Sequence, residues 1–292
     1  MNYVDIDSAE YPYLLKQIKD PPVKLYFKGN WDMDVFEEML SVVGSRKMTG
    51  YGEMITESLV SEIAGNGITI VSGFMYGIDA QAHKAALMVG GRTVAVMPCG
   101  IERIHPEYQA ELYCGIVNNG GLAISEYPGD TPPVKWTYPR RNRIIAGLSP
   151  VLLVVEAGMK SGALITADIA RRYNKKIFAV PGPLTSSVSR GTALLIKQGA
   201  SLVTGPQDLL LEYGRTKTGR FFPGKDLQEL HAGQKKIIDL LSLGPLEIDE
   251  IARLSGKPVP EIGADITALS LKRYLVPKDG KYYLSQGGCN VD

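Results

Sequence analysis

Short apolar runs alternate with longer amphipathic stretches through the middle of the chain. The runs are rich in Val, Ile and Leu, and most of them end abruptly in Gly, Ser or Pro. Short apolar runs between helical patterns are typical of strands that are buried on both faces of a parallel sheet. We predict such strands over residues 40–44, 68–71, 92–97, 122–125, 150–155, 176–180 and 200–203.

The stretches between these runs have helical periodicity. Several end at glycine signals, such as Gly65-Asn66-Gly67, which are common where helices stop. Helices are predicted over residues 50–65, 78–89, 106–118, 139–146, 162–173, 190–198 and 206–213. Strands joined by helical crossovers indicate an α/β fold, with a parallel sheet that carries helices on both faces. Ligands of such sheets bind beyond the carboxyl ends of the strands, where the Gly-, Ser- and Arg-rich turns of this chain fall.

The two ends of the chain differ from this central domain, residues 40–214. Residues 1–39 form a preface that we expect to pack on the core. Its predicted elements are a short helix over 10–18, a strand over 24–27 and a linker or short helix over 31–39. A polar and basic linker is expected over residues 215–233.

Residues 234–285 have the pattern of a small winged-helix domain. Its signals are three helical stretches and a strong two-residue hairpin turn, Asp279-Gly280. The helices are predicted over 234–242, 247–254 and 259–271, the strands over 274–276 and 281–284, and a frayed tail over 285–292.

Composition is that of an ordinary globular protein, with 45% hydrophobic and 22% charged residues. The formal net charge of +1 does not indicate a nucleic-acid partner, so an anion site must come from local clustering. Three cysteines without CxxC spacing are expected to be reduced thiols in a cytoplasmic protein. The first residues do not have the pattern of a signal peptide, and no apolar run approaches the length of a membrane span.

Turns at the predicted strand ends are the first candidates for chemistry. Backbone amides, hydroxyl groups and a guanidinium beside a helix start suit a phosphate. The alternative is a set of tight turns, in which glycines serve packing, Asp79 caps a helix, and the histidine at 83 belongs to the core. The candidate residues are Gly44, Ser45, Arg46, Ser72, Gly73, Gly77, Asp79, Lys160 and Ser161.

A basic and aromatic stretch, residues 135–143, is the strongest local signal. Four cations occur here, and the sequence has no acidic residue from Thr131 to Val155. Basic side chains follow a phosphate backbone, and aromatic rings stack on bases for roughly 1–3 kcal/mol each. The alternative is a solvated helix start, although such a face normally mixes both signs of charge. The candidates in this stretch are Lys135, Tyr138, Arg140, Arg141, Asn142 and Arg143.

Several enzyme motifs are missing from the sequence. There is no GxxxxGK[ST] P-loop and no GxSxG elbow, and Gly50-Tyr51-Gly52 is followed by Ile55 instead of the third glycine of a dinucleotide fingerprint. No His, Cys, Asp or Glu cluster has metal-ligand spacing. We therefore expect no nucleotide cofactor, no metal and no catalytic residue.

Seven motifs in order resemble the DNA-processing protein A (DprA/Smf) family. They are VVGSR at 42–46, SGFMYGIDAQAH at 72–83, SEYPGD at 125–130, YPRRNRIIAGLS at 138–149, VVEAGMKSGALITA at 154–167, VPGPLTSSVSRGT at 180–192 and LIKQGA at 195–200. The resemblance covers roughly residues 10–285.

The resemblance implies an extended Rossmann-like fold that binds single-stranded DNA without a cofactor. It implies a mediator that protects incoming DNA, loads RecA recombinase during natural transformation, and forms a homodimer. Gly44, Ser45 and Arg46 would hold a phosphate, and the adjoining loop would be shaped by Ser72, Gly73, Gly77 and Asp79. The groove would be lined by Tyr138, Arg140, Asn142, Arg143, Lys160 and Ser161. Two departures from the family are an aromatic residue, Tyr76, where many members have Arg, and the lack of an N-terminal helical module.

Two other functions compete with this hypothesis. A phosphoribohydrolase-like enzyme on a related core would cleave nucleotides with a PGGxGT…E pattern, but here the four residues that follow Thr192, Ala193 to Ile196, include no Glu. A regulator of duplex DNA would read the major groove with helix 259–271. That helix offers Glu261 and Asp265 but no Lys or Arg, which makes a poor major-groove reader.

Overall fold

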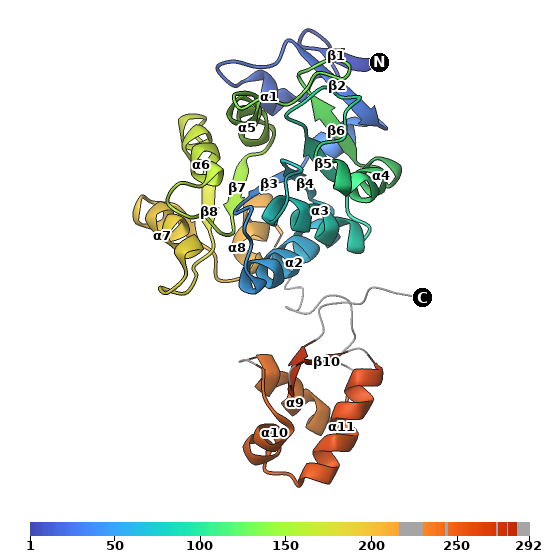
Figure 1. Cartoon of the computed structure of the whole chain (residues 1–292), viewed down its shortest axis with the longest axis vertical. Coiled ribbons are helices and arrows are strands. Elements are labelled where there is room, and N and C mark those ends of the chain that lie inside the picture. Colours follow the sequence, from blue (N-terminus) through green and yellow to red (C-terminus); the bar gives the residue numbers. More distant parts are fainter. Residues whose placement is uncertain (216–229, 243–244, 273, 279, 285–292) are drawn as a thin grey trace. The chain divides into compact units, whose positions relative to one another are not determined.

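The computed structural model describes residues 1–215, 230–242, 245–272, 274–278 and 280–284 (Figure 1). The chain forms two compact units, Met1–Phe221 and Phe222–Asp292. Most of the predicted linker, the hairpin residue Asp279 and the predicted tail with Cys289 lie outside the described residues. Among the residues that are described, no helix has both the length and the apolar character to cross a membrane.

The first unit is built on a nine-stranded sheet in the order β1-β2-β6-β5-β4-β3-β7-β8-β9. Seven of these strands, from β6 across to β9, pair in parallel, as the apolar runs predict. Their bounds are β3 (Met39–Val43), β4 (Thr69–Ser72), β5 (Thr93–Val96), β6 (Leu122–Ser125), β7 (Val151–Val154), β8 (Lys176–Ala179) and β9 (Ser201–Leu202).

The preface joins this sheet instead of only packing on it. β1 (Asn2–Asp5) was not predicted, and it pairs antiparallel with β2 (Lys24–Gly29), which in turn pairs antiparallel with β6. Half-exposed edge strands lack the continuous apolar run that marks a central strand, which explains why β1 was missed. The predicted helix over 10–18 is reduced to α1 (Tyr13–Lys16), and η1 (Met33–Phe36) precedes β3.

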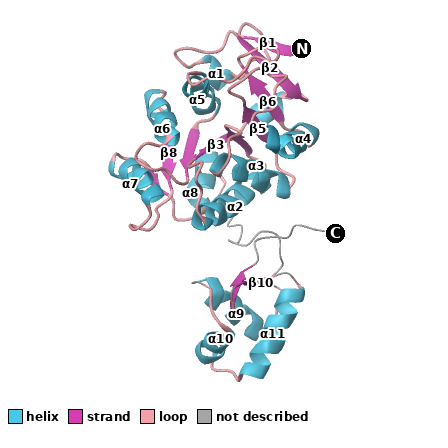
Figure 2. Cartoon of the chain, in the orientation of Figure 1, coloured by secondary structure: helices cyan, strands magenta, loops and turns pink. Residues whose placement is uncertain are grey.

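Helices cover both faces of the sheet (Figures 1 and 2). Alternate residues of β3 enter different cores: Leu40 and Val42 pack with α2, α3 and α8, whereas Met39 and Val43 pack with α1, α5 and α6. The helices are α2 (Gly50–Gly65), α3 (Ile78–Met88), α4 (Ala110–Asn118), α5 (Thr137–Leu148), α6 (Gly162–Arg172), α7 (Arg190–Lys197) and α8 (Pro206–Leu210), with single turns η2 (Glu107–Gln109), η3 (Ser187–Ser189) and η4 (Leu211–Tyr213).

Two helix starts differ from the sequence prediction. The stretch over 106–118 divides into η2 and α4, and α5 starts at Thr137, two residues before Pro139. Proline is tolerated in the first turn of a helix, where its missing N–H has no intrahelical partner. The basic stretch 135–143 is therefore mostly helix, so its side chains point in different directions.

The strand order reverses at β3. The chain runs outward from β3 through β4, β5 and β6, and then returns through α5 to place β7 on the other side of β3. The carboxyl ends of β3 and β7 thus flank a topological switch point, the usual ligand position in an open α/β sheet. The turn at residues 44–46 lies at this point.

In its described residues, the second unit contains three helices and a hairpin. They are α9 (Ala232–Ser242), α10 (Ile248–Ser255), α11 (Val259–Leu271), β10 (Leu275–Lys278) and β11 (Lys281–Leu284). Its own apolar core includes Ile237, Ile251 and Leu269. This is the winged-helix arrangement that the sequence predicts.

Candidate nucleic-acid interface

The turn after β3 is fixed by close packing. A Cβ on Gly44 would lie 2.5 Å from Cγ1 of Ile78, so only glycine lets the chain pass the start of α3. Ser45 is buried, and its Oγ accepts a hydrogen bond from the Lys47 amide at 3.0 Å. The Ser45 carbonyl accepts from the Ile78 amide at 3.2 Å. The turn is therefore held rigidly against α3.

Arg46 extends from this turn into solvent between two aromatic rings. Its guanidinium carbon lies 5.6 Å from the ring centre of Tyr76 and 5.3 Å from that of Tyr138. Cation–π contacts of this kind orient a guanidinium by its face and leave the N–H donors at its edge free. Arg46 is exposed, so these donors are available to an anion.

Tyr138 and Tyr76 come from different elements, and each is positioned separately. The Tyr138 hydroxyl lies 2.8 Å from Nε2 of His105, a residue that the sequence analysis did not single out. Burial and the neighbouring Arg103 lower the pKa of His105. Tyr76, the departure from the family pattern, is 43% exposed and precedes Gly77 in the turn after β4.

Gly77 joins the second turn to the first. Its φ is +81°, and a Cβ there would lie 2.9 Å from the Arg46 Cα and closer still to the Ser45 carbonyl oxygen. Side chains rarely adopt this conformation. Gly77 is also the N-cap of α3, and Asp79 makes no side-chain cap. The capping alternative for Asp79 is therefore wrong.

Asp79 and Arg141 are opposite charges that are buried near each other beneath the two turns. Both lie within 2.8 Å of the point where Gly73 would carry a Cβ, and Asp79 also accepts a hydrogen bond from the Met75 amide. Burial raises the pKa of Asp79 to about 6, against the opposing effect of Arg141. Burial likewise lowers the pKa of Arg141 to about 10.

Arg141 is not a groove-lining side chain. It is 3% exposed, and its guanidinium donates to the carbonyl oxygens of Gly73 and Val96. Ser72, also buried, donates its hydroxyl to the Val42 carbonyl at 2.6 Å. These groups join the ends of neighbouring strands below the surface and support the turns from inside.

The prediction that no acidic residue balances the cations of residues 135–143 is wrong once the chain is folded. Glu126, which follows β6, accepts from Arg140 Nε at 3.0 Å and also pairs with the buried Arg143. Arg143 further donates to the carbonyl of Asp20. Glu126 and Asp20 lie outside the α5 segment of the sequence, and the fold brings them to these arginines.

The other predicted residues occupy varied positions. Lys135 is exposed, and Asn142 is half-buried with Oδ1 accepting from Arg141 Nε at 3.2 Å. Lys160 is exposed in the turn after β7, while Ser161 caps α6 by accepting from the Ala163 amide at 3.2 Å. Lys135 and Lys160 are the members of this group that present a charge to solvent.

A buried carboxylate and a core histidine complete the surroundings. Glu156 follows β7, is 2% exposed, and accepts hydrogen bonds from the amide and hydroxyl of Thr49, which fixes the start of α2. Glu156 lies within the motif at 154–167, but it was not among the candidate residues. His83 is buried, with Nδ1 2.7 Å from Thr93 Oγ1, and so belongs to the core. In the described parts of the chain, no group of three His, Cys, Asp or Glu could hold a metal.

Two protein-family models match this chain, one in each unit. The model of DNA recombination-mediator protein A matches residues 2–214, and the DprA winged-helix model matches residues 223–281. The chain belongs to the DNA recombination-mediator protein A family. Both units are therefore accounted for, and the resemblance seen in the motifs is confirmed.

Individual relatives agree with this assignment. Protein Smf of Escherichia coli is 37% identical over 294 residues, covering 99% of this chain and 78% of the relative. The X-ray structure of DprA from Streptococcus pneumoniae matches with 39% identity and a TM-score of 0.67, over 72% of this chain and 74% of that one. DprA from Helicobacter pylori, described for its single-stranded DNA binding mode, matches with 32% identity and a TM-score of 0.64, over 72% and 95%.

Proposed function

We propose that this protein binds single-stranded DNA along the carboxyl edge of its sheet, with a phosphate on the turn at Gly44, Ser45 and Arg46. The observation that carries the proposal is the exposed Arg46 guanidinium held between Tyr76 and Tyr138. The rigid turn and the oriented N–H groups of Arg46 suit two oxygens of one phosphate. The exposed ring of Tyr76 beside them suits a base that is not stacked in a duplex.

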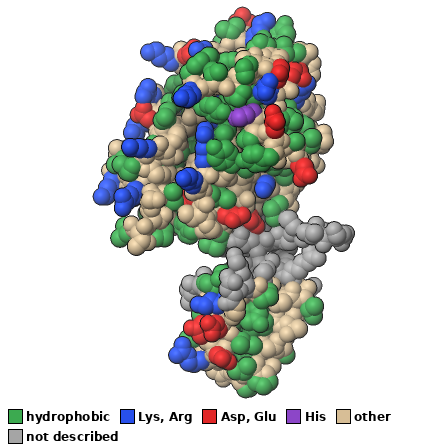
Figure 3. All heavy atoms as spheres, in the orientation of Figure 1, with side chains coloured by type: hydrophobic (Ala, Val, Ile, Leu, Met, Phe, Trp, Pro, Cys, Tyr) green, Lys and Arg blue, Asp and Glu red, His purple; other side chains and the backbone are tan. Residues whose placement is uncertain are grey.

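The charge distribution favours a path toward α6 and α7. Of the seven Lys or Arg in residues 157–200, Lys160 and Arg190 lie near the carboxyl ends of the strands, and the other five lie near the C-terminal ends of α6 and α7, at the opposite edge. Figure 3 shows many blue side chains over the α6 and α7 side of the first unit. Lys160 and Arg190 follow the ends of β7 and β8, at the same edge as Arg46. Lys160 and Arg190 would extend the phosphate site at Arg46 into a groove.

Membership of the family supports a wider role in DNA processing. We infer a DNA-processing protein that protects incoming strands and loads RecA recombinase in natural transformation or homologous recombination, without catalysis. A homodimer in the cytoplasm is the expected form. Titrating purified protein into a RecA filament assay on single-stranded DNA tests the loading step, and the absence of any acceleration would contradict it.

Arg46 provides the direct test of the DNA site. Arg46→Ala should weaken single-stranded DNA binding about tenfold, since hydrogen bonds to charged groups contribute ~1.5–3 kcal/mol. The slope of log affinity against log salt should also fall by about 0.7 for each phosphate that is no longer bound. Fluorescence anisotropy with single- and double-stranded oligonucleotides across a salt series measures both.

Arg172→Ala is the matched control for Arg46→Ala. Arg172 is also exposed, but it lies in the last turn of α6, at the opposite edge of the sheet, where it pairs with Asp168. Equal losses of affinity in the two variants would place the DNA elsewhere. Incubation with nucleoside monophosphates tests the hydrolase alternative, and free base whose release depends on Arg46 would overturn the binding proposal.

A further inference from the structure

His105 lies beside the proposed phosphate site, in the segment between β5 and η2. Its Nε2 is 2.8 Å from the Tyr138 hydroxyl, and the two ring centres are 6.1 Å apart. The same Tyr138 ring lies 5.3 Å from the guanidinium carbon of Arg46. One tyrosine therefore contacts both the exposed cation and the imidazole, so His105 can act on the site through Tyr138.

We infer that His105 is a positioning residue of the DNA site, and that a bound strand takes up one proton at its Nε2. The affinity for single-stranded DNA then rises as the pH falls. The inference rests on the proposed function, because it needs a phosphate on Arg46. It gives a role to a histidine that was not a candidate in the sequence, and to a hydroxyl group that the proposed function does not use.

The hydrogen bond between His105 and Tyr138 can run in two directions. A neutral imidazole has one acceptor nitrogen, so Nε2 can accept the Tyr138 O–H. An imidazolium has an N–H on both nitrogens and no acceptor. A proton taken up at Nε2 therefore makes this nitrogen the donor to the Tyr138 oxygen. The hydroxyl proton is then free to point to a phosphate oxygen.

Tyr138 keeps its hydroxyl proton throughout this exchange. Burial raises the pKa of Tyr138 above its ordinary value, although the nearby Arg46 opposes this effect. A phenol titrates far above the range in which histidine titrates. The group that changes its charge near neutral pH is therefore the imidazole, and the tyrosine passes the change on as a reoriented donor.

The charged groups that act on His105 come from several elements. They are Arg103 and Glu107 on its own segment, Arg46 in the turn after β3, Arg141 in α5, and Asp130, which pairs with Arg103 at 2.7 Å. Burial is the main cause that lowers the pKa of His105, the arginines lower it further, and Glu107 opposes them. The free protein therefore favours the neutral imidazole.

A bound phosphate changes this balance. Its negative charge offsets the surrounding cations and favours the imidazolium, so the pKa of His105 is higher in the complex than in the free protein. A group whose pKa rises on binding takes up a proton, and the affinity increases as the pH falls between the two pKa values. Below the lower value, both forms are protonated and the affinity levels off.

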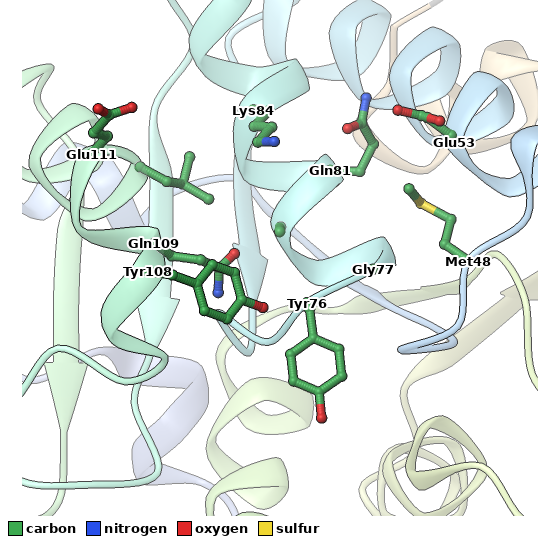
Figure 4. A pocket seen from close by; sticks show the side chains of 11 residues that line it. Met48, Glu53, Tyr76, Gly77, Gln81, Lys84, Tyr108, Gln109 and Glu111 are labelled. Atoms are coloured by element: carbon green, nitrogen blue, oxygen red, sulfur yellow. The ribbon is translucent and has the colours of Figure 1, made fainter.

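The chain around His105 is fixed before a strand binds. Gln109 in η2 is 7% exposed, and its amide donates to the Phe74 carbonyl at 3.1 Å, in the turn after β4. Figure 4 shows Gln109 and Tyr76 at the same cavity, between η2 and α3. The segment of His105 and the turn of Tyr76 are thus held together, so binding changes the proton of the imidazole and not its place.

A pH series with labelled oligo(dT) tests the inference, because thymine does not titrate between about pH 6 and about pH 8. At constant ionic strength, anisotropy should give an affinity about fivefold higher at the lower pH, on the scale of one hydrogen bond to a charged group. Calorimetry in two buffers of different ionisation enthalpy should show net proton uptake on binding. No uptake anywhere in this range would overturn the inference.

His105→Gln provides the decisive comparison. Glutamine can donate to the Tyr138 oxygen or accept from its O–H, but it does not titrate. The affinity at about pH 8 should therefore stay unchanged, and the rise toward about pH 6 should be lost. Tyr138→Phe keeps the ring beside Arg46 and removes the hydroxyl, so it should also lose the rise. Thermal melts check that both variants are folded.

His231→Gln is the matched control. The chain has three histidines. His83 is buried, and burial lowers its pKa to about 3, so it does not titrate in this range. His231 is exposed in the second unit, 2.9 Å from Asp265. The variant removes an accessible imidazole outside the proposed site and should keep the full rise in affinity.

Asp79 is the competing source of a proton, because burial raises its pKa to about 6. A rise that persists in His105→Gln would assign the uptake to Asp79 and overturn the inference. A rise that is lost in His105→Gln but kept in Tyr138→Phe would show that the imidazolium contacts the strand directly, and it would overturn the route through Tyr138.

Arg46→Ala separates this inference from the proposed function. If Arg46→Ala weakens binding while the affinity shows no rise that depends on His105, the phosphate site stands and the inference is wrong. If Arg46→Ala has no effect, the DNA lies elsewhere and both are wrong.

Discussion

Two arginines that are neighbours in the sequence have opposite environments. Arg140 is half-exposed and pairs with Glu126 at the surface, whereas Arg141 is buried against Asp79 and two carbonyl oxygens. Helical geometry separates adjacent side chains by about 100°, so one enters the core and the other does not. From the sequence alone, both arginines were predicted to contact DNA.

Arg141→Met and Arg140→Met form a matched pair that tests this difference. Arg141→Met removes the positive charge near the buried Asp79 carboxylate and leaves two buried carbonyl oxygens without their donor, which should cost about 3–5 kcal/mol of unfolding free energy. Arg140→Met removes a partly exposed ion pair and should cost less than about 1 kcal/mol. Urea denaturation at neutral pH measures both, and similar costs would contradict the burial of Arg141.

At the level of secondary-structure elements, the site is two turns packed against each other. The turn after β3 and the turn after β4 meet where Gly77 approaches Ser45 and Arg46. Neither turn has a ligand-binding fingerprint in its own sequence. Their chemistry arises because parallel strands bring their carboxyl ends to one edge, and because glycine allows the backbones to touch.

Gly77→Ala should damage the site beyond its effect on the backbone. The new Cβ would press on the Arg46 backbone, move the phosphate turn and lower single-stranded DNA affinity, by about tenfold if Arg46 no longer reaches the phosphate. Gly90→Ala is the control, since Gly90 also has a positive φ, +69°, but open space around it.

Gly90→Ala should reduce stability by about 1–2 kcal/mol from backbone strain alone, with unchanged DNA affinity. Denaturation of both variants measures the loss of stability from backbone strain. Anisotropy measures the loss of DNA affinity that a displaced Arg46 turn would cause. Equal DNA affinities for the two variants would show that packing of one turn on the other does not support binding.

Across the whole molecule, the chain has two units with separate cores. The proposed DNA site lies wholly within Met1–Phe221. The second unit has its own core around Ile237 and Leu269, and α11 carries Glu261 and Asp265 without a basic residue. We expect the winged helix to act in protein contacts or to assist DNA binding only weakly.

A chain that ends at residue 221 should therefore retain single-stranded DNA affinity within about threefold of the full chain. The reason is that the phosphate contacts that dominate affinity belong to the first unit. Anisotropy at two salt concentrations, alongside a RecA loading assay, compares the truncated and full chains. Loss of most DNA affinity on truncation would assign the winged helix a direct role in binding.

Local patterns in the amino-acid sequence were enough to place the central strands and helices, because apolar periodicity and glycine stops are local signals. Seven motifs in order also identified the family, and the turn at Gly44, Ser45 and Arg46 was already a candidate. The folded arrangement was needed to show that β1 and β2 extend the sheet and that Tyr76 and Tyr138 lie on Arg46. It also showed that Arg141 and Arg143 are buried, and that Arg143 pairs with Glu126. Contacts such as Glu126 with Arg143 join segments that are separate in the chain, so no local pattern records them.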